Sequence, residues 1–162
     1  MAERPDLSSK GPDPIPADYR GVTPYLCIKD AARALEFYQR AFGARETMRM
    51  AQPDGRIGHA EIRIGDAVVM LADEFPEMGF RSPQTLGGSP VNLLVYVQDV
   101  DAFVKQAEAA GATVQRPPSD QFYGDRMAVL TDPFGHGWSI ATHIEDVPED
   151  EMQRRAQQKH DG

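Results

Sequence analysis

The sequence has one cysteine, Cys27, and no long run of apolar residues. A single cysteine excludes an internal disulfide and a metal site built from several thiolates. On a central strand, such a cysteine is more often inert packing than a nucleophile. No apolar stretch approaches the ~18 residues that a membrane span needs. Because the N-terminal region also lacks the apolar core of a signal peptide, we expect a cytoplasmic protein.

Positive charge is also scarce. The chain has 17 Lys and Arg residues against 25 Asp and Glu residues, which gives a net charge of -8. This balance disfavours binding to nucleic acid or to an anionic membrane surface, since both need a basic patch. A length of 162 residues suits one domain with a hydrophobic core and is short for two independent ones.

What the sequence does contain is an internal repeat. Residues 22–72 and 91–143 each have the pattern of a strand, a helix and a run of further strands. Each expected helix follows a capping aspartate and ends at a glycine: Asp30 and Gly43 in the first copy, Asp99 and Gly111 in the second. A repeated unit usually cannot bury its apolar face alone. We therefore expect one α+β domain in which each helix covers one face of its sheet and the two free faces border a shared cavity.

Three segments lie outside the repeat. Residues 1–20 are rich in proline and charge and are expected to form a flexible leader. Residues 73–90 are long for a plain connection and carry Phe75 and Phe80. This segment is either a crossover packed on the sheet, or a lid or dimer arm whose aromatic side chains close the cavity. Residues 147–162 form a charged tail that is expected to contain a short helix.

Several short motifs identify a family resemblance. They are Thr23-Pro-Tyr-Leu, Ala34-Leu-Glu-Phe-Tyr-Gln-Arg-Ala-Phe-Gly-Ala44, Gly58-His-Ala-Glu61, Gly124-Asp-Arg126 and Asp132-Pro-Phe-Gly-His-Gly-Trp-Ser-Ile-Ala-Thr-His143. Together they resemble the vicinal oxygen chelate superfamily, also called the glyoxalase, bleomycin resistance protein and dioxygenase group, and within it a glyoxalase-like, demethylubiquinone-methyltransferase-like subgroup. The resemblance implies a domain over residues 21–146 with two βαβββ modules pairing mixed sheets around a concave ligand cavity. It also implies a homodimer, because pockets in this superfamily are commonly completed across a subunit interface.

The resemblance further implies where a metal ion would bind. Metal-using members hold a divalent ion with His, Glu or Gln side chains from the first and last strand of each module. Counted from the strand–helix junctions and the turns, those four positions fall on Thr23, Met70, Asn92 and Ser139. None of these is a good ligand for a hard or borderline divalent ion. A register slip of one residue would only turn each side chain to the opposite face, so we expect no metal and no other cofactor.

Another candidate site lies on one expected strand. His59, Glu61 and Arg63 alternate with apolar residues and therefore share its polar face. They form either a solvated strand face or pocket wall, or a His/Glu pair for metal or acid/base chemistry, with His143 as a third ligand if a metal is bound. His136, in a turn, is interpreted as hydrogen-bonding locally.

Two functions from different classes remain open. The first is a metal-independent protein of the bleomycin-resistance type that binds an apolar or aromatic small molecule. Its expected ligand-binding residues are Thr23, Tyr25, Met70, Asn92, Leu94, Tyr96, Tyr123 and Ser139. The second is a glyoxalase-like or dioxygenase-like enzyme with a divergent metal site or a metal-free acid/base pair, for which His59 and Glu61 are the catalytic candidates. The sequence does not name the ligand.

Overall fold

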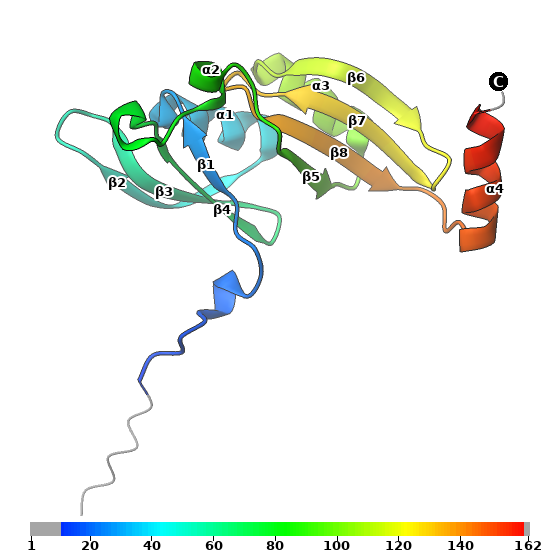
Figure 1. Cartoon of the computed structure of the whole chain (residues 1–162), viewed down its shortest axis with the longest axis horizontal. Coiled ribbons are helices and arrows are strands. Elements are labelled where there is room, and N and C mark those ends of the chain that lie inside the picture. Colours follow the sequence, from blue (N-terminus) through cyan, green and yellow to red (C-terminus); the bar gives the residue numbers. More distant parts are fainter. Residues whose placement is uncertain (1–10, 161–162) are drawn as a thin grey trace, which may run out of the picture.

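The computed structural model describes residues 11–160, and Figure 1 shows two similar units joined end to end. The predicted leader therefore lies partly outside the described residues. The first unit contains β1 (Tyr25–Ile28), α1 (Ala31–Phe42), β2 (Arg45–Ala51), β3 (Ile57–Ile64) and β4 (Ala67–Asp73). The second contains β5 (Asn92–Tyr96), α3 (Val100–Ala110), β6 (Thr113–Asp120), β7 (Asp125–Thr131) and β8 (Gly137–His143). These two units are called module 1 and module 2 below.

The two modules have the same sheet topology. The strand order is β1-β4-β3-β2 in module 1 and β5-β8-β7-β6 in module 2. In each, the first strand runs parallel to the last, and the other pairs are antiparallel. Tyr25 lies opposite Met70 just as Leu94 lies opposite Ser139, so the registers correspond as well. The predicted α+β class with two βαβββ modules and mixed sheets is confirmed.

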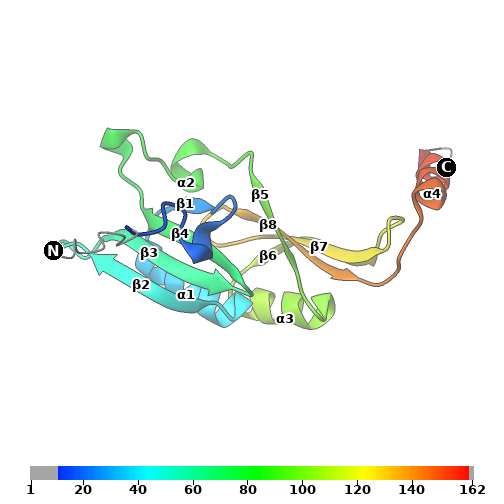
Figure 2. The same ribbon diagram turned by 90° about the horizontal axis from the view of Figure 1, so that it is seen from below.

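The helices begin and end where their caps require. The side chains of Asp30 and Asp99 accept hydrogen bonds from backbone N–H groups three residues further on. Gly43 and Gly111 end the helices in the left-handed conformation, which glycine adopts without steric cost. Figure 2 shows α1 and α3 on the same side of the strands, where they contact each other. Their apolar faces and the inward faces of both sheets form one continuous core.

A buried aspartate joins the modules. Asp132, in the turn between β7 and β8, is 4% exposed. One of its oxygens accepts the hydroxyl of Tyr38 from α1 of module 1 at 2.5 Å and the indole N–H of Trp138 at 2.9 Å. The other oxygen accepts the backbone N–H groups of Phe134 and His136. A side chain that organises a turn of module 2 is thus also bonded to the helix of module 1.

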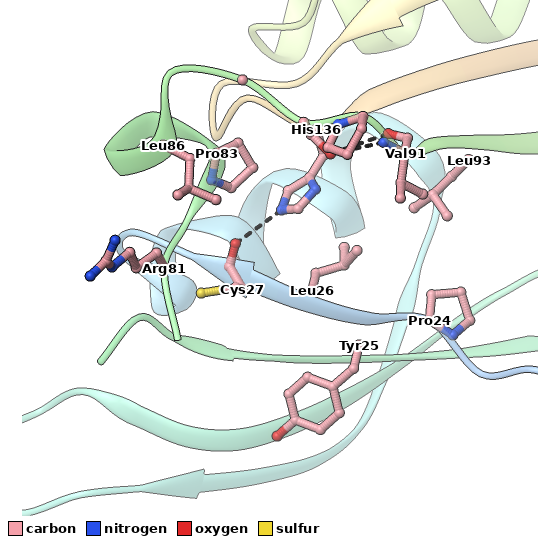
Figure 3. Close-up of a pocket in the computed structure, with 13 residues that line it drawn as sticks. Pro24, Tyr25, Leu26, Cys27, Arg81, Pro83, Leu86, Val91, Leu93 and His136 are labelled. Atoms are coloured by element: carbon pink, nitrogen blue, oxygen red, sulfur yellow. Dashed lines mark hydrogen bonds between the residues drawn. The ribbon is translucent and has the colours of Figure 1, made fainter. Parts of the chain in front are cut away.

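The local interpretation of His136 is wrong for its side chain. Its backbone N–H bonds within the turn, but its imidazole Nε2 donates to the backbone carbonyl of Cys27 on β1, at 3.0 Å. Figure 3 shows this bond reaching from the turn to the strand. The contact spans 109 residues, so local turn chemistry could not predict it.

Within residues 11–160, neither α1 nor α3 covers the second face of either sheet. Tyr25, Leu94 and Tyr96 on these faces are 46%, 51% and 57% exposed, respectively. The connection between the modules contains a 3-10 helix η2 (Pro76–Met78) and α2 (Pro83–Leu86), and α4 (Glu149–His160) follows module 2. In Figure 2 this connection lies on the opposite side of the strands from α1 and α3, and α4 lies beyond the ends of β7 and β8. Among the described residues, no helix is long and apolar enough to cross a membrane.

Candidate functional site

The connection between the modules covers part of the open face of module 1. Phe75 and Phe80 exchange backbone hydrogen bonds of 2.8 and 3.2 Å, which fold the segment into a small hairpin around η2. Phe80 meets the ring of Tyr25 edge-on, with 6.0 Å between ring centroids. The resulting cavity has a volume of about 370 Å³. Its lining residues are Tyr25, Gly58, Ala72, Phe75, Met78 and Phe80.

Next to this cavity, polar side chains of module 1 form a hydrogen-bonded network centred on Glu61. Its carboxylate accepts the hydroxyl of Tyr19 at 2.6 Å and lies 3.1 Å from Nε2 of His59. Nδ1 of His59 lies 2.7 Å from the hydroxyl oxygen of Tyr25. Tyr19 belongs to a 3-10 helix, η1 (Ala17–Tyr19), and its neighbour Asp18 pairs with Arg63 at 2.8 Å. The end of the predicted leader therefore packs on β3.

The protonation states of this network follow from its contacts. The hydrogen bonds from Tyr19 and then His59 lower the pKa of Glu61, which keeps its carboxylate ionised. The bond to Glu61 raises the pKa of the Tyr19 hydroxyl. Burial, followed by the charge of Glu61, raises the pKa of Tyr25. Both phenols therefore keep their protons at neutral pH.

Module 2 carries a second network of similar composition on its open face. The hydroxyl of Tyr96 donates to Asp125 at 2.6 Å, and this bond is the main cause of the raised pKa of Tyr96. The two ring nitrogens of His143 lie 2.8 Å from Asp146 and 2.8 Å from Asp125, and these bonds raise the pKa of His143. Burial alone would raise the pKa of Asp125, but the bonds from Tyr96 and His143 lower it. Here the tyrosine of the first strand bonds directly to the carboxylate, whereas in module 1 Tyr25 bonds to the histidine.

The four positions implied for a metal ion can now be located. Asn92 donates its side-chain amide to the hydroxyl of Ser139 at 2.5 Å. Met70 lies between Tyr25 and Glu61 in the strand register, and Thr23 is half-buried just before β1. Carboxylate and imidazole groups are missing at these four described positions, so the donor set does not fit a divalent ion.

The other ligand combinations are not assembled either. Across residues 11–160, no three His, Cys, Asp or Glu side chains gather into a group that could hold a metal ion. His59 and Glu61 lie together on β3, whereas His143 lies on β8 with Asp125 and Asp146 as its partners. The hypothesis of a metal site made from His59, Glu61 and His143 is therefore wrong.

The remaining predicted residues are spread over module 2. Leu94 and Tyr96 point away from the core on β5, beside Ser139 and Ala141 of β8. Tyr123 follows β6, is half-buried, and donates its hydroxyl to the sulfur of Met127 at 3.4 Å. The structure thus brings Tyr25, His59 and Glu61 together in module 1 and keeps the candidates from β5 and β8 in module 2.

A further cavity lies between the modules, with a volume of about 330 Å³. Figure 3 shows Pro83, Leu86 and His136 on one side of β1 and the ring of Tyr25 directed to the other side. Cys27 also lines this cavity. Burial raises the pKa of its thiol to about 11, so the thiolate form needed for nucleophilic attack is scarce at neutral pH.

Two members of the networks were missed by sequence reasoning. Tyr19 was assigned to the leader, and the sequence carries no local signal for its contact with Glu61, 42 residues away. Asp125 lies in the motif Gly124-Asp-Arg126, but that motif does not indicate its contacts with Tyr96 and His143. The neighbouring Arg126 pairs with Asp101 and Asp120. The strand pattern that places Asp125 beside Tyr96 and His143 could have indicated its role only once the order β5-β8-β7 was known.

Two mycobacterial proteins resemble this chain in sequence. Uncharacterized proteins from Mycobacterium bovis and Mycobacterium tuberculosis are each 44% identical to this chain over 144 residues. The match covers 87% of this chain, 95% of the M. bovis protein and 85% of the M. tuberculosis protein.

Solved structures show the same fold. The crystal structure of TioX from Micromonospora sp. ML1 has a TM-score of 0.60 and 28% identity, covering 79% of this chain and 99% of TioX. Fosfomycin resistance protein FosX from Mesorhizobium loti has a TM-score of 0.57, covering 77% of this chain and 93% of FosX. At 17% identity, the likeness to FosX shows the fold alone. A family model described as Glyoxalase/Bleomycin resistance protein/Dioxygenase superfamily matches residues 22–140, and the chain therefore belongs to this superfamily.

Proposed function

We propose that the protein binds a small, largely apolar organic molecule on the open sheet face, without the divalent ion that other members of its superfamily use. The observation that carries this proposal is the contrast between two sets of residues. The four positions implied for metal ligands hold Thr23, Met70, Asn92 and Ser139, which are poor ligands. The surrounding face instead offers the aromatic and aliphatic side chains that line most small-molecule pockets.

The cavity beneath the connection supports this proposal. Phe75 and Phe80 are held over Tyr25 by the small hairpin, and five of the six lining residues carry no hydroxyl or charged group. Its volume of about 370 Å³ falls within the range of small-molecule sites. The connection accordingly acts as a cover for a ligand and not merely as a link between modules.

The site is proposed to be completed in a homodimer. Leu94 and Tyr96 are more than half exposed on module 2, and large exposed apolar groups of this kind favour association. A second copy that places its module 2 over module 1 would bury these side chains and enclose the ligand between the two sheets. We place this dimer in the cytoplasm, and sedimentation velocity would distinguish dimer from monomer.

The test combines metal analysis with ligand binding. Mass spectrometry of the purified protein is expected to find no stoichiometric divalent ion, and dialysis against a chelator should leave the melting temperature unchanged. A thermal-shift screen of small aromatic compounds is expected to yield stabilising ligands. About one tightly bound ion per subunit would contradict the metal-independent site.

The proposed role of the connection in covering the ligand is tested by a double substitution. Replacing Phe75 and Phe80 with Ala should weaken the best ligand of the screen about tenfold or more, because each ring contributes apolar contact area. The melting temperature of the free protein should change little, since both rings lie outside the common core. A parallel loss of melting temperature and affinity would instead mean that the connection is simply part of the packing.

A second candidate function is acid/base catalysis by His59 and Glu61. The observation in its favour is their hydrogen bond of 3.1 Å beside the proposed ligand cavity, because a carboxylate that orients a histidine is a recurring catalytic arrangement. A His59→Gln variant that binds the screened ligands normally but loses all turnover of them would favour this function. Binding without turnover in the natural protein would favour the first.

A further inference from the structure

The cavity under the connection offers a hydrogen-bonding side chain on one side. Of its six described lining residues, Tyr25 alone carries a hydroxyl or charged group. Tyr25 is 46% exposed, and its hydroxyl bonds to His59, the residue that follows the lining Gly58. A molecule in this cavity would therefore meet aromatic walls and a single phenol that is connected to the Glu61 network.

The direction of each hydrogen bond in this network can be deduced. An ionised Glu61 only accepts hydrogen bonds, so Nε2 of His59 must carry the proton of the 3.1 Å contact. In the neutral imidazole, Nδ1 is then an acceptor, and the 2.7 Å contact is a bond donated by the Tyr25 hydroxyl. The hydroxyl oxygen of Tyr25 keeps free lone pairs, so the ligand group that binds to it must be a hydrogen-bond donor.

We propose that Tyr25, His59 and Glu61 form a proton relay that accepts the hydroxyl proton of a bound phenol. In the transfer, the O–H bond of the ligand breaks and a new O–H bond forms on Tyr25. The original hydroxyl proton of Tyr25 moves to Nδ1 of His59. The products are a ligand phenolate, an intact Tyr25 hydroxyl that donates to it, and an imidazolium whose Nε2–H group is bonded to Glu61. No oxidant or co-reactant is needed.

A phenol fits this site better than an aliphatic alcohol does. The aromatic rings of Phe75 and Phe80 suit a planar ring. A phenol, whose ordinary pKa is close to that of tyrosine, about 10, is far more acidic than an aliphatic alcohol, so its proton is the easier one to pass to Tyr25 and on to His59. The bond from Tyr19 to Glu61 holds the carboxylate in place, which makes Tyr19 a positioning residue. This proposal rests on the proposed function, because its ligand occupies the same cavity.

The relay is tested with 4-nitrophenol, whose phenolate has a visible absorption band, and with 4-nitroanisole, which has the same ring but no hydroxyl proton. In neutral buffer, where free 4-nitrophenol is only partly ionised and an ordinary imidazole is mainly neutral, binding to the natural protein should increase the phenolate band. The phenol should also bind about tenfold more tightly than the anisole. The Tyr25→Phe variant keeps the ring that contacts Phe80, so it should bind both probes with similar affinity and cause no increase in the phenolate band.

The outcomes separate this proposal from the one on which it rests. Equal binding of the two probes to the natural protein, or an equal increase of the phenolate band in Tyr25→Phe, would overturn the relay while leaving the apolar ligand site intact. If neither probe binds, the apolar site fails and the relay fails with it. A melting curve for Tyr25→Phe that matches the natural protein would confirm that the comparison concerns one fold.

A second measurement examines the relay without any ligand. The ¹⁵N NMR resonances of the His59 ring should report a protonated Nε2 and an unprotonated Nδ1, with His59→Gln used for assignment. The Glu61→Gln variant should change this pattern and weaken the phenolate band. A proton on Nδ1 of the natural protein would overturn the relay, because Tyr25 would then have no acceptor to receive its proton.

Discussion

The two modules use the same kinds of residue in a different order. In module 1, His59 stands between Tyr25 and Glu61, so the tyrosine contacts a group that can take up a proton. In module 2, Asp125 stands between Tyr96 and His143, so the tyrosine contacts an ionised acceptor and the histidine is held between two carboxylates. A tyrosine, a histidine and a carboxylate thus make a hydrogen-bonded chain suited to proton transfer in module 1. In module 2 the same kinds of group make a fixed arrangement of charges.

The turns between the last two strands also differ between the modules, in how deeply they are buried. In module 1, Gly65 and Asp66 form an exposed turn between β3 and β4. In module 2, the corresponding turn between β7 and β8 is buried around Asp132 and bonded to Tyr38 of module 1. Turns at equivalent places in the two sheets are therefore not equally buried. The turn that lies in the common interior is the one from module 2.

The largest effect on stability is expected when the aspartate of each turn is replaced. Asp132→Ala would leave the buried Tyr38 hydroxyl and Trp138 indole N–H without their acceptor, and should lower the free energy of unfolding by about 3 kcal/mol. Asp66→Ala, in the exposed turn of module 1, should change it by no more than about 0.5 kcal/mol. Urea unfolding followed by circular dichroism measures both. Similar losses in the two variants would mean that the turns are energetically alike.

An intermediate effect is expected at the histidine rings. Tyr25→Phe removes the group that donates directly to Nδ1 of His59 and should move the ¹⁵N resonance of that nitrogen. Tyr96→Phe should move the ring resonances of His143 much less, because Asp125 separates the two side chains. Comparable shifts at both histidines would contradict the different order of the two networks.

The smallest effect concerns the pH dependence of stability in module 2. The pKa of His143 is raised in the folded protein. Its stabilising contribution is therefore complete below the pKa of an unfolded histidine, about 6.5, and is lost as the pH rises through the higher folded-state value. His143→Gln should be less stable than the natural protein in mildly acidic buffer, and the difference should disappear in alkaline buffer. Chemical unfolding at several pH values measures this difference, and a gap that widened with pH would disprove the assignment.

The architecture could be predicted because its signals are local. Capping aspartates, closing glycines and strand alternation each depend on residues a few positions apart, and they mark the same helices that the structure contains. The extent of β6 was less predictable. β6 continues to Asp120 through Pro117 and Pro118, residues that normally argue against a strand. These prolines cannot donate to the ladder and fall at a register shift between Arg116 and Ser119 on this edge strand.

The candidate site could be predicted only in part. The alternation on β3 placed His59 and Glu61 on one face, which needs no knowledge of other strands. The contacts of His59 with Tyr25 and of Glu61 with Tyr19 depend on strand order and on the path of the chain before β1. Long-range pairings of this kind leave no periodic signal, so the sequence supplied the residues but not the connection between them.

The position of Asp132 has a consequence for how the protein opens. Its bond to Tyr38, together with the contact between α1 and α3, gives the modules a common interior. Opening either module would expose the interior of the other, so the two are expected to behave as one cooperative unit. Amide hydrogens of α1 and α3 should then exchange with solvent at the same slow rate, through a single global event. The two copies that are visible in the sequence are thus expected to fold and unfold together.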